Sequence, residues 1–342
     1  MLLPVLTPVE RRRRRRRRSW RPRVAVLVAL GAAGLAAWHW WPAGSSSQAA
    51  TSPPPAEVDR APSVVRSVRV AAAAAAQAAQ QVTAARLVVV RSQPKARLVP
   101  ALTSRSAILI DGATGDVVFW LKPHARVPIA SVTKIMTVLL ALEKLKPHDI
   151  VTVAPLATRA PANSEGLKPH ERVEAWKLLY ASMLYSGNDS ALALAIAVGG
   201  SRAGFLRLMN DRARTLELTD THFNSVSGVI DEDNYSSAWD LAALSRLAMQ
   251  NPRFRTIVGT KQKRVEWAAP TNWKVYVNHN RLLTQYPGAD GVKTGWTTIA
   301  RHTLVASVRR GGTWLIGVTL GSKDSFTDMK RLLDLGFRLR GS

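Results

Sequence analysis

The most reactive combination of side chains in this sequence is a serine followed three residues later by a lysine, in Ser131-Val132-Thr133-Lys134. Residues three apart on a helix lie on one face, so the two side chains are expected to meet. A serine hydroxyl is a poor nucleophile near neutral pH and needs an adjacent base. Burial of Lys134 would lower the pKa of its ammonium group and let the amine accept the Ser131 proton. The spacing alone is common in helices, and it indicates nucleophilic catalysis only together with other groups.

A second group is Ser186-Gly187-Asn188, which falls on a turn between two predicted helices. A hydroxyl at this place can pass a proton to a leaving amine, and the Asn188 amide can hold Lys134 or a substrate carbonyl. By itself the tripeptide is ordinary loop sequence, in which Asp189 or Ser190 caps the next helix.

A third group, Lys293-Thr294-Gly295, lies on a predicted strand. An edge strand binds an extended peptide by main-chain pairing, and Lys293 would neutralise a terminal carboxylate that Thr294 also contacts. Gly295 lets a substrate approach the backbone closely. The backbone N–H groups of Ser131 and Trp296 are then candidates for an oxyanion hole.

The elements that must position these groups follow from hydrophobic spacing. Apolar residues after Pro128 recur at the spacing of a buried helix that begins near Ser131. Further helices are predicted over 175–184, 189–198, 203–216 and 325–335, and strands over 107–110, 116–121, 291–296, 303–308 and 314–320. Strands at both ends with helices between them predict an α+β fold, in which an antiparallel sheet formed by both chain ends accompanies a helical lobe.

Composition narrows the chemistry further. The chain has 342 residues, no cysteine and seven scattered histidines, which argues against a thiolate nucleophile, a disulfide scaffold or a metal site. We therefore expect no cofactor and no metal. Of the net charge of +25, residues 1–23 carry +9, with ten arginines and one glutamate, and the remaining +16 is spread over 319 residues. This distribution argues against a nucleic-acid partner and favours a membrane or another anionic surface.

The N-terminal part divides into three predicted segments. Residues 1–23 form a basic cytoplasmic segment, and 24–42 form a membrane anchor or signal segment that ends in tryptophans. We favour an uncleaved anchor over a cleavable signal peptide. Residues 43–103 are predicted as a flexible tether rich in alanine, serine and proline. The catalytic domain is expected over 104–338, without an additional C-terminal β-domain.

From Ser104 to Phe337 the chain resembles the serine-type D-Ala-D-Ala carboxypeptidases, the low-molecular-mass penicillin-binding proteins of peptidase family S11. The three groups above match the S-x-x-K, S-x-N and K-T-G motifs of such enzymes. The resemblance extends to Pro128-Ile129-Ala130, Thr221-His222-Phe223-Asn224, Ser227-Gly228, Tyr235-Ser236-Ser237-Ala238-Trp239-Asp240-Leu241, Asp290-Gly291-Val292 and Leu332-Leu333-Asp334-Leu335-Gly336-Phe337. It implies the serine β-lactamase/D,D-peptidase-like fold.

The resemblance also implies roles. Ser131 would form the acyl-enzyme, Lys134 would accept its proton, Ser186 would relay a proton, and Lys293 would bind the substrate carboxylate. The substrate would be the D-alanyl-D-alanine end of a peptidoglycan stem peptide, and β-lactam antibiotics would acylate the same serine. The location would be extracytoplasmic, in the cell envelope, either tethered to the cytoplasmic membrane or secreted.

Three alternatives stay open at this point. An endopeptidase that cuts peptidoglycan cross-links would use the same serine, although Gly187 favours the carboxypeptidase. A class A-like β-lactamase would carry aspartate in place of Gly187. A non-catalytic wall-binding scaffold is disfavoured because all the reactive side chains are present. One departure from the family pattern is Arg301, which stands where the family usually has glycine.

Overall fold

The computed structural model describes residues 73–83, 85–86, 100–229, 232–268 and 272–340. The predicted basic segment and the predicted membrane segment lie outside this range, as does most of the predicted tether. Among the described residues, no single helix has the length and apolarity of a membrane span. Only the pair Asn188–Gly199 and Arg202–Thr215 meets that test jointly, across a bend of 83°.

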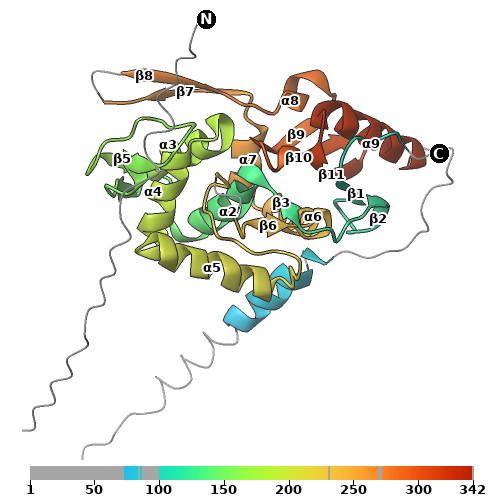
Figure 1. Cartoon of the computed structure of the whole chain (residues 1–342), viewed down its shortest axis with the longest axis horizontal. Coiled ribbons are helices and arrows are strands. Elements are labelled where there is room, and N and C mark those ends of the chain that lie inside the picture. The colour runs from blue at the N-terminus through green and yellow to red at the C-terminus, as the bar shows by residue number, and fades with distance from the viewer. Residues whose placement is uncertain (1–72, 84, 87–99, 230–231, 269–271, 341–342) are drawn as a thin grey trace, which may run out of the picture. The chain divides into compact units, whose positions relative to one another are not determined.

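A five-stranded antiparallel sheet, in the order β2-β1-β11-β10-β9, is the framework of the domain. Its strands are β1 (Ser106–Asp111), β2 (Val117–Leu121), β9 (Ala289–Thr297), β10 (Arg301–Arg310) and β11 (Thr313–Ser322). The first described strand, β1, pairs with the last strand, β11, so the two ends of the domain meet inside one sheet (Figure 1). This confirms the predicted fold class and leaves β9, which carries Lys293-Thr294-Gly295, at an open edge.

Successive side chains of a strand point to opposite faces of the sheet, so they pack into two different cores. On β1, Ile108 and Ile110 join the core shared with the helical lobe, whereas Ala107 and Leu109 join a second core. The second core is closed by the helix α9 (Ser325–Arg340), which lies along the sheet in Figure 1. The strand β1 is therefore buried on both faces.

The helices of the other lobe are inserted between β2 and β9. They are η3 (Ala130–Thr133), α2 (Lys134–Lys144), η4 (Ala157–Arg159), α3 (Ala175–Tyr180), η5 (Ala181–Tyr185), α4 (Asn188–Gly199), α5 (Arg202–Thr215), α6 (Ala238–Ala248), α7 (Pro252–Gly259) and α8 (Leu282–Gln285). Three two-stranded pairs complete the domain: β3 (Val127–Pro128) with β6 (Tyr235–Ser236), β4 (Ile150–Thr152) with β5 (Arg172–Glu174), and β7 (Gln262–Glu266) with β8 (Trp273–Val277).

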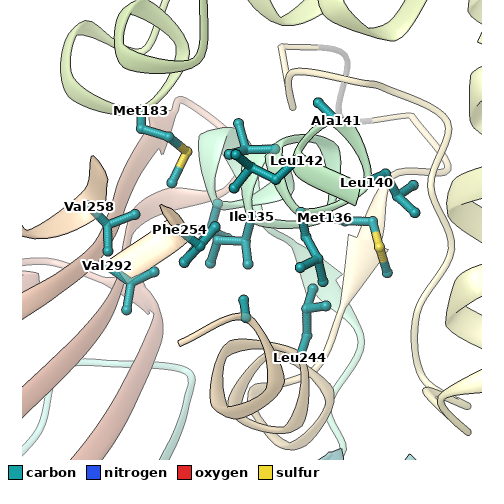
Figure 2. Packing of buried hydrophobic residues seen from close by; sticks show 14 of the residues in the cluster. Ile135, Met136, Leu140, Ala141, Leu142, Met183, Leu244, Phe254, Val258 and Val292 are labelled. Atoms are coloured by element: carbon teal, nitrogen blue, oxygen red, sulfur yellow. The ribbon is translucent and has the colours of Figure 1, made fainter. Parts of the chain in front are cut away.

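The helix that follows the candidate nucleophile, α2, is surrounded by apolar side chains. Its Ile135 and Leu142 lie near Phe254 of α7, and Val292 of β9 lies on the same side (Figure 2). The side chains of Ile135 and Phe254 are fully buried. This packing holds α2 against the sheet. It thereby determines where the first turn of α2 lies relative to β9.

One helix falls within the segment predicted as a tether. Residues 73–83 are helical, and Ala85 just beyond them is buried. The guanidinium of Arg246, on α6, donates to the backbone carbonyls of Thr83 and Arg86, both at 3.4 Å. A cation at a helix C-terminus is favourable because the last carbonyl groups lack partners within the helix.

Candidate active site

The first turn of the nucleophile region is a 3₁₀ turn rather than the α-helix that the spacing predicts from Ser131. The turn η3 ends at Thr133, and α2 begins at Lys134. Ala130, just before Ser131, adopts a left-handed backbone with φ of 49°. Thr133 Oγ1 donates to the Ala130 carbonyl at 2.8 Å and accepts from Asn234 Nδ2 at 3.0 Å. These contacts hold the unusual turn and thereby position the Ser131 hydroxyl.

The amine of Lys134 lies at the centre of the site. The side chain is fully buried, and Nζ lies 3.1 Å from Ser131 Oγ, 2.8 Å from Asn188 Oδ1 and 2.8 Å from the Ser227 carbonyl oxygen. The first two motifs of the sequence therefore meet at one atom. Asn188 Nδ2 donates to the Pro161 carbonyl at 2.8 Å, which orients the amide so that its oxygen faces Lys134.

The surroundings of Lys134 favour its neutral form. Burial lowers the pKa of this lysine well below its ordinary value, the charge of Lys293 lowers it further, and Asp189 opposes both. A neutral amine has two N–H groups and one lone pair. The Asn188 and Ser227 oxygens accept hydrogen bonds but offer no proton, so they take the two N–H groups. The lone pair is then left for the Ser131 hydroxyl, which is the arrangement of a general base.

Ser186 lies between η5 and α4 in a left-handed conformation, with φ of 68°. It is 4% exposed, and its Oγ makes no hydrogen bond within the part of the chain that the structure describes. A buried hydroxyl costs free energy when it lacks a partner. In the chain it lies two residues before Asn188, whose amide oxygen contacts Lys134.

Asp189 holds the loop in front of the second motif. Its carboxylate accepts from the Ser164 hydroxyl at 2.7 Å, from the Glu165 backbone at 2.9 Å and from the Gly166 backbone at 3.0 Å. The sequence suggested a helix cap at Asp189 or Ser190, but no side chain caps α4. Instead, the aspartate connects this helix to the loop whose Pro161 carbonyl orients Asn188.

Gly295 of the Lys293-Thr294-Gly295 motif packs closely against the backbone at Ser131. A Cβ added at Gly295 would lie 2.8 Å from the Ser131 backbone nitrogen and 2.5 Å from Thr303 Oγ1, so only glycine fits. Thr303 Oγ1, on the neighbouring strand, donates to the Ile129 carbonyl at 3.1 Å. This contact joins β10 to the segment before the nucleophile and places β9 beside Ser131.

Lys293 is buried, with 1% of its surface exposed, and its Nζ donates to the Thr294 carbonyl at 2.9 Å. Burial lowers the pKa of Lys293 from its ordinary value of 10.5 to about 7. Burial lowers the pKa of His279, and the charge of Lys293 lowers it further; the His279 ring lies 5.9 Å from that of Tyr185. A buried cation without a carboxylate partner is suited to bind an anionic substrate group.

Gly228 is the residue beyond the three motifs on which this geometry most depends. Its φ is +78°, and an added Cβ would lie 1.8 Å from the Ala130 carbonyl oxygen and 2.8 Å from Thr133 Oγ1. The preceding Ser227 carbonyl accepts from Lys134. The Ser-Gly pair was part of the family resemblance, but the sequence alone did not show that it contacts the lysine.

The Gly228→Ala variant is expected to lose activity about a hundredfold or more, because it displaces the turn that carries Ser131. Gly200→Ala is the matched control, since Gly200 also has a positive φ, +71°, but has no neighbour within 4 Å of an added Cβ. Gly200→Ala should lose about 1 kcal/mol of stability from the left-handed backbone alone, and Gly228→Ala should lose more because its Cβ also meets the Ala130 carbonyl. Equal activity of the two variants would show that Gly228 does not position the nucleophile.

The described residues contain no group of three or more His, Asp or Glu side chains that could hold a metal ion. The arrangement that is present, a serine beside a neutral lysine with a second buried lysine on an open strand edge, suits acyl transfer to and from a peptide.

Comparison with known proteins agrees with this geometry. Residues 91–324 match the model of the D-alanyl-D-alanine carboxypeptidase family, peptidase S11. The chain belongs to the D-alanyl-D-alanine carboxypeptidase family. It is 34% identical over 243 residues to D-alanyl-D-alanine carboxypeptidase DacF of Bacillus subtilis. This alignment covers 68% of this chain but only 62% of that relative. It is 33% identical over 262 residues to the D-alanyl-D-alanine carboxypeptidase of Streptomyces sp. K15, covering 70% of this chain and 89% of that protein.

Solved structures of the family show the same fold. The crystal structure of the Streptomyces K15 DD-transpeptidase superposes with a TM-score of 0.66 at 32% identity, covering 70% of this chain and 98% of that one. A putative penicillin-binding protein homologue from Mycobacterium tuberculosis gives a TM-score of 0.68 at 31% identity, covering 74% and 97%. The chain therefore matches nearly the full length of both solved structures.

Proposed function

We propose that this protein is a serine D,D-carboxypeptidase that removes the terminal D-alanine from peptidoglycan stem pentapeptides. The observation that carries the proposal is the contact of Lys134 Nζ with Ser131 Oγ, while Asn188 and Ser227 occupy the two N–H groups of the amine. This arrangement creates a nucleophile and its base from neighbouring residues, and the names of the relatives support the choice of substrate.

In the acylation step, Ser131 Oγ attacks the carbonyl carbon of the penultimate D-alanine as its proton passes to Lys134 Nζ. The backbone N–H groups of Ser131 and Trp296 stabilise the negative charge on the carbonyl oxygen. The carbon–nitrogen bond then breaks, and the proton moves from Lys134, through the Ser186 hydroxyl, to the leaving amine of D-alanine. The products are free D-alanine and an ester at Ser131.

In deacylation, a water molecule takes the place of the leaving amine. Lys134, neutral again, accepts a proton from this water, and the resulting hydroxide attacks the ester carbonyl. The ester bond breaks, the proton returns to Ser131 Oγ, and the shortened peptide leaves with a new carboxylate. β-Lactams would acylate the same serine and be hydrolysed slowly.

In this proposal the edge of β9 binds the terminal carboxylate of the substrate. The substrate adds as a strand to β9, Lys293 attracts the carboxylate, and Thr294 donates a hydrogen bond to it. The substrate chain therefore runs from its C-terminus beside Lys293 toward its N-terminal residues beyond Trp296.

The pH dependence of activity should reflect Lys293. Above about pH 7 the lysine loses its charge in the free enzyme, so kcat/KM for a carboxylate substrate should fall.

The stability of the protein should change in the opposite direction. Between pH 7 and 10.5 Lys293 binds fewer protons in the folded protein than in the unfolded chain, so the free energy of unfolding rises with pH. Rate profiles and thermal unfolding over pH 6–10 test both, and Lys293→Gln should remove the alkaline fall in rate. A wild-type rate that stays constant from pH 6 to 9 would contradict this account.

The test of the proposal is product analysis. Incubation with a stem pentapeptide should release free D-alanine, whereas cross-linked muropeptides should remain largely intact. The opposite pattern would identify the endopeptidase. Rapid hydrolysis of penicillin would favour a class A-like β-lactamase, which would be expected to carry aspartate in place of Gly187.

The location and attachment of the enzyme form part of the same proposal. The active site acts outside the cytoplasmic membrane, where peptidoglycan lies, and residues 24–42 hold the chain to the membrane as an uncleaved anchor. The arginine run and the apolar stretch that follows it support this orientation. Membrane fractionation of the full chain, compared with a chain lacking residues 1–42, tests the attachment.

A further inference from the structure

Arg301 begins β10, directly after the turn that follows β9, and its backbone is in the left-handed region with φ of 58°. Such a φ favours glycine and costs free energy for a residue with a Cβ. The family pattern, with glycine at this place, agrees with that cost. The arginine therefore stands here at a cost in free energy that glycine would avoid.

The guanidinium of Arg301 is free to bind a ligand. The residue is exposed and makes no hydrogen bond, ion pair or ring contact with the residues that the structure describes. No acidic residue occurs from Val292 to the end of β10. By contrast Arg309, at the other end of β10, is paired with Asp290 at 3.0 Å.

Arg301 lies beside the course that the substrate is proposed to follow along β9. In the sheet register Arg301 pairs with Thr297, and Thr303 pairs with Gly295, the glycine beside Ser131. Arg301 therefore lies two strand residues, about 6.6 Å, beyond the reacting position. This is the direction in which the substrate continues toward its N-terminal residues.

Two large apolar side chains are exposed at this end of β9 and β10, although Trp296, which pairs with His302, lies on the sheet face opposite to Thr303. Trp296 and Ile299 are each 61% exposed, and the ring of Trp296 lies 6.4 Å from that of His302. A strand added to β9 would lie about 10 Å from β10, two strand spacings. The long side chain of an arginine and the side chain of a substrate residue can together cover that distance.

We propose that Arg301 is a specificity-determining residue, which binds a side-chain carboxylate on the substrate residue that precedes the two D-alanines. Its planar guanidinium suits a carboxylate, and Ile299, exposed in the preceding turn, offers apolar surface nearby. This inference rests on the proposed function, because it needs a peptide that ends in D-Ala-D-Ala on β9.

The test compares two peptides, N-acetyl-L-Glu-D-Ala-D-Ala and N-acetyl-L-Gln-D-Ala-D-Ala, which differ only in that carboxylate. The full chain should release D-alanine from the Glu peptide about twofold to fivefold faster in kcat/KM, the size expected of an exposed ion pair. High salt should reduce the difference. Arg301→Gly should abolish it, and Arg301→Lys should retain part of it.

Lys122→Gly is the matched control, because Lys122 is another exposed cation at positive φ, 45°, and follows β2 at the opposite edge of the sheet. Both glycine variants should unfold at the same or a higher temperature, but only Arg301→Gly should lose the preference. Equal rates of the wild type on the two peptides would overturn the role of Arg301 alone. Absence of D-alanine release from both peptides would overturn the proposed function and this inference together.

Discussion

Ser131→Ala should release no measurable D-alanine from a stem pentapeptide and should form no covalent adduct with penicillin. Among the hydrogen-bond partners that Lys134 Nζ has within the described residues, the Ser131 hydroxyl alone can form the acyl-enzyme, since the other two are an amide and a carbonyl oxygen. Loss of the nucleophile of a serine enzyme costs about 10⁶-fold in rate. Release of D-alanine and fluorescent penicillin labelling of the purified full chain measure the two effects.

Ser245→Ala is the control for this variant. Ser245, on α6, is also fully buried, and its Oγ has no hydrogen-bond partner among the described residues. Its replacement should leave both readouts unchanged. If Ser131→Ala kept penicillin labelling while its unfolding temperature matched the wild type, another residue would have to be the nucleophile.

Lys134→Gln should slow acylation about a hundredfold to ten-thousandfold, the contribution expected of a general base. Glutamine can still donate to the Asn188 and Ser227 oxygens, but it has no lone pair basic enough to take the Ser131 proton. The second-order rate constant for penicillin acylation measures this step directly. Because the charge of Lys293 and the carbonyls around the site remain, binding of the substrate should change much less than the rate.

Lys144→Gln provides the comparison on the same helix, since Lys144 is exposed at the end of α2. This variant should react with penicillin at the wild-type rate. An acylation rate for Lys134→Gln within a few-fold of the wild type would show that the proton goes elsewhere, for example to water or to Ser186.

Part of the geometry of the candidate site could be predicted from the sequence, because local spacing determined it. Ser131 and Lys134 are neighbours on one turn, and the K-T-G residues share one short strand. The sheet was also predictable, since apolar runs near both ends of the domain could only be buried by pairing with each other. The family resemblance then joined motifs that lie far apart in the chain.

The contacts that complete the site depend on tertiary packing and left little sequence signal. Lys134 meets Asn188 and Ser227 only after the helical lobe has folded. Asp189 looked like an ordinary helix cap, but its carboxylate holds the Ser164–Gly166 loop. The β7–β8 pair was also missed, because Tyr276 faces inward toward Glu165, with its hydroxyl 2.7 Å from the carboxylate, while Val275 is 53% exposed.

The most direct test of the account is mass spectrometry of the full chain after exposure to penicillin, with the modified peptide sequenced. We predict that the mass increases by one penicillin, that the adduct persists long enough to be isolated, and that it maps to the peptide containing Ser131. An adduct on a different residue, the absence of any adduct, or turnover so rapid that none accumulates would contradict the proposal of a serine D,D-carboxypeptidase.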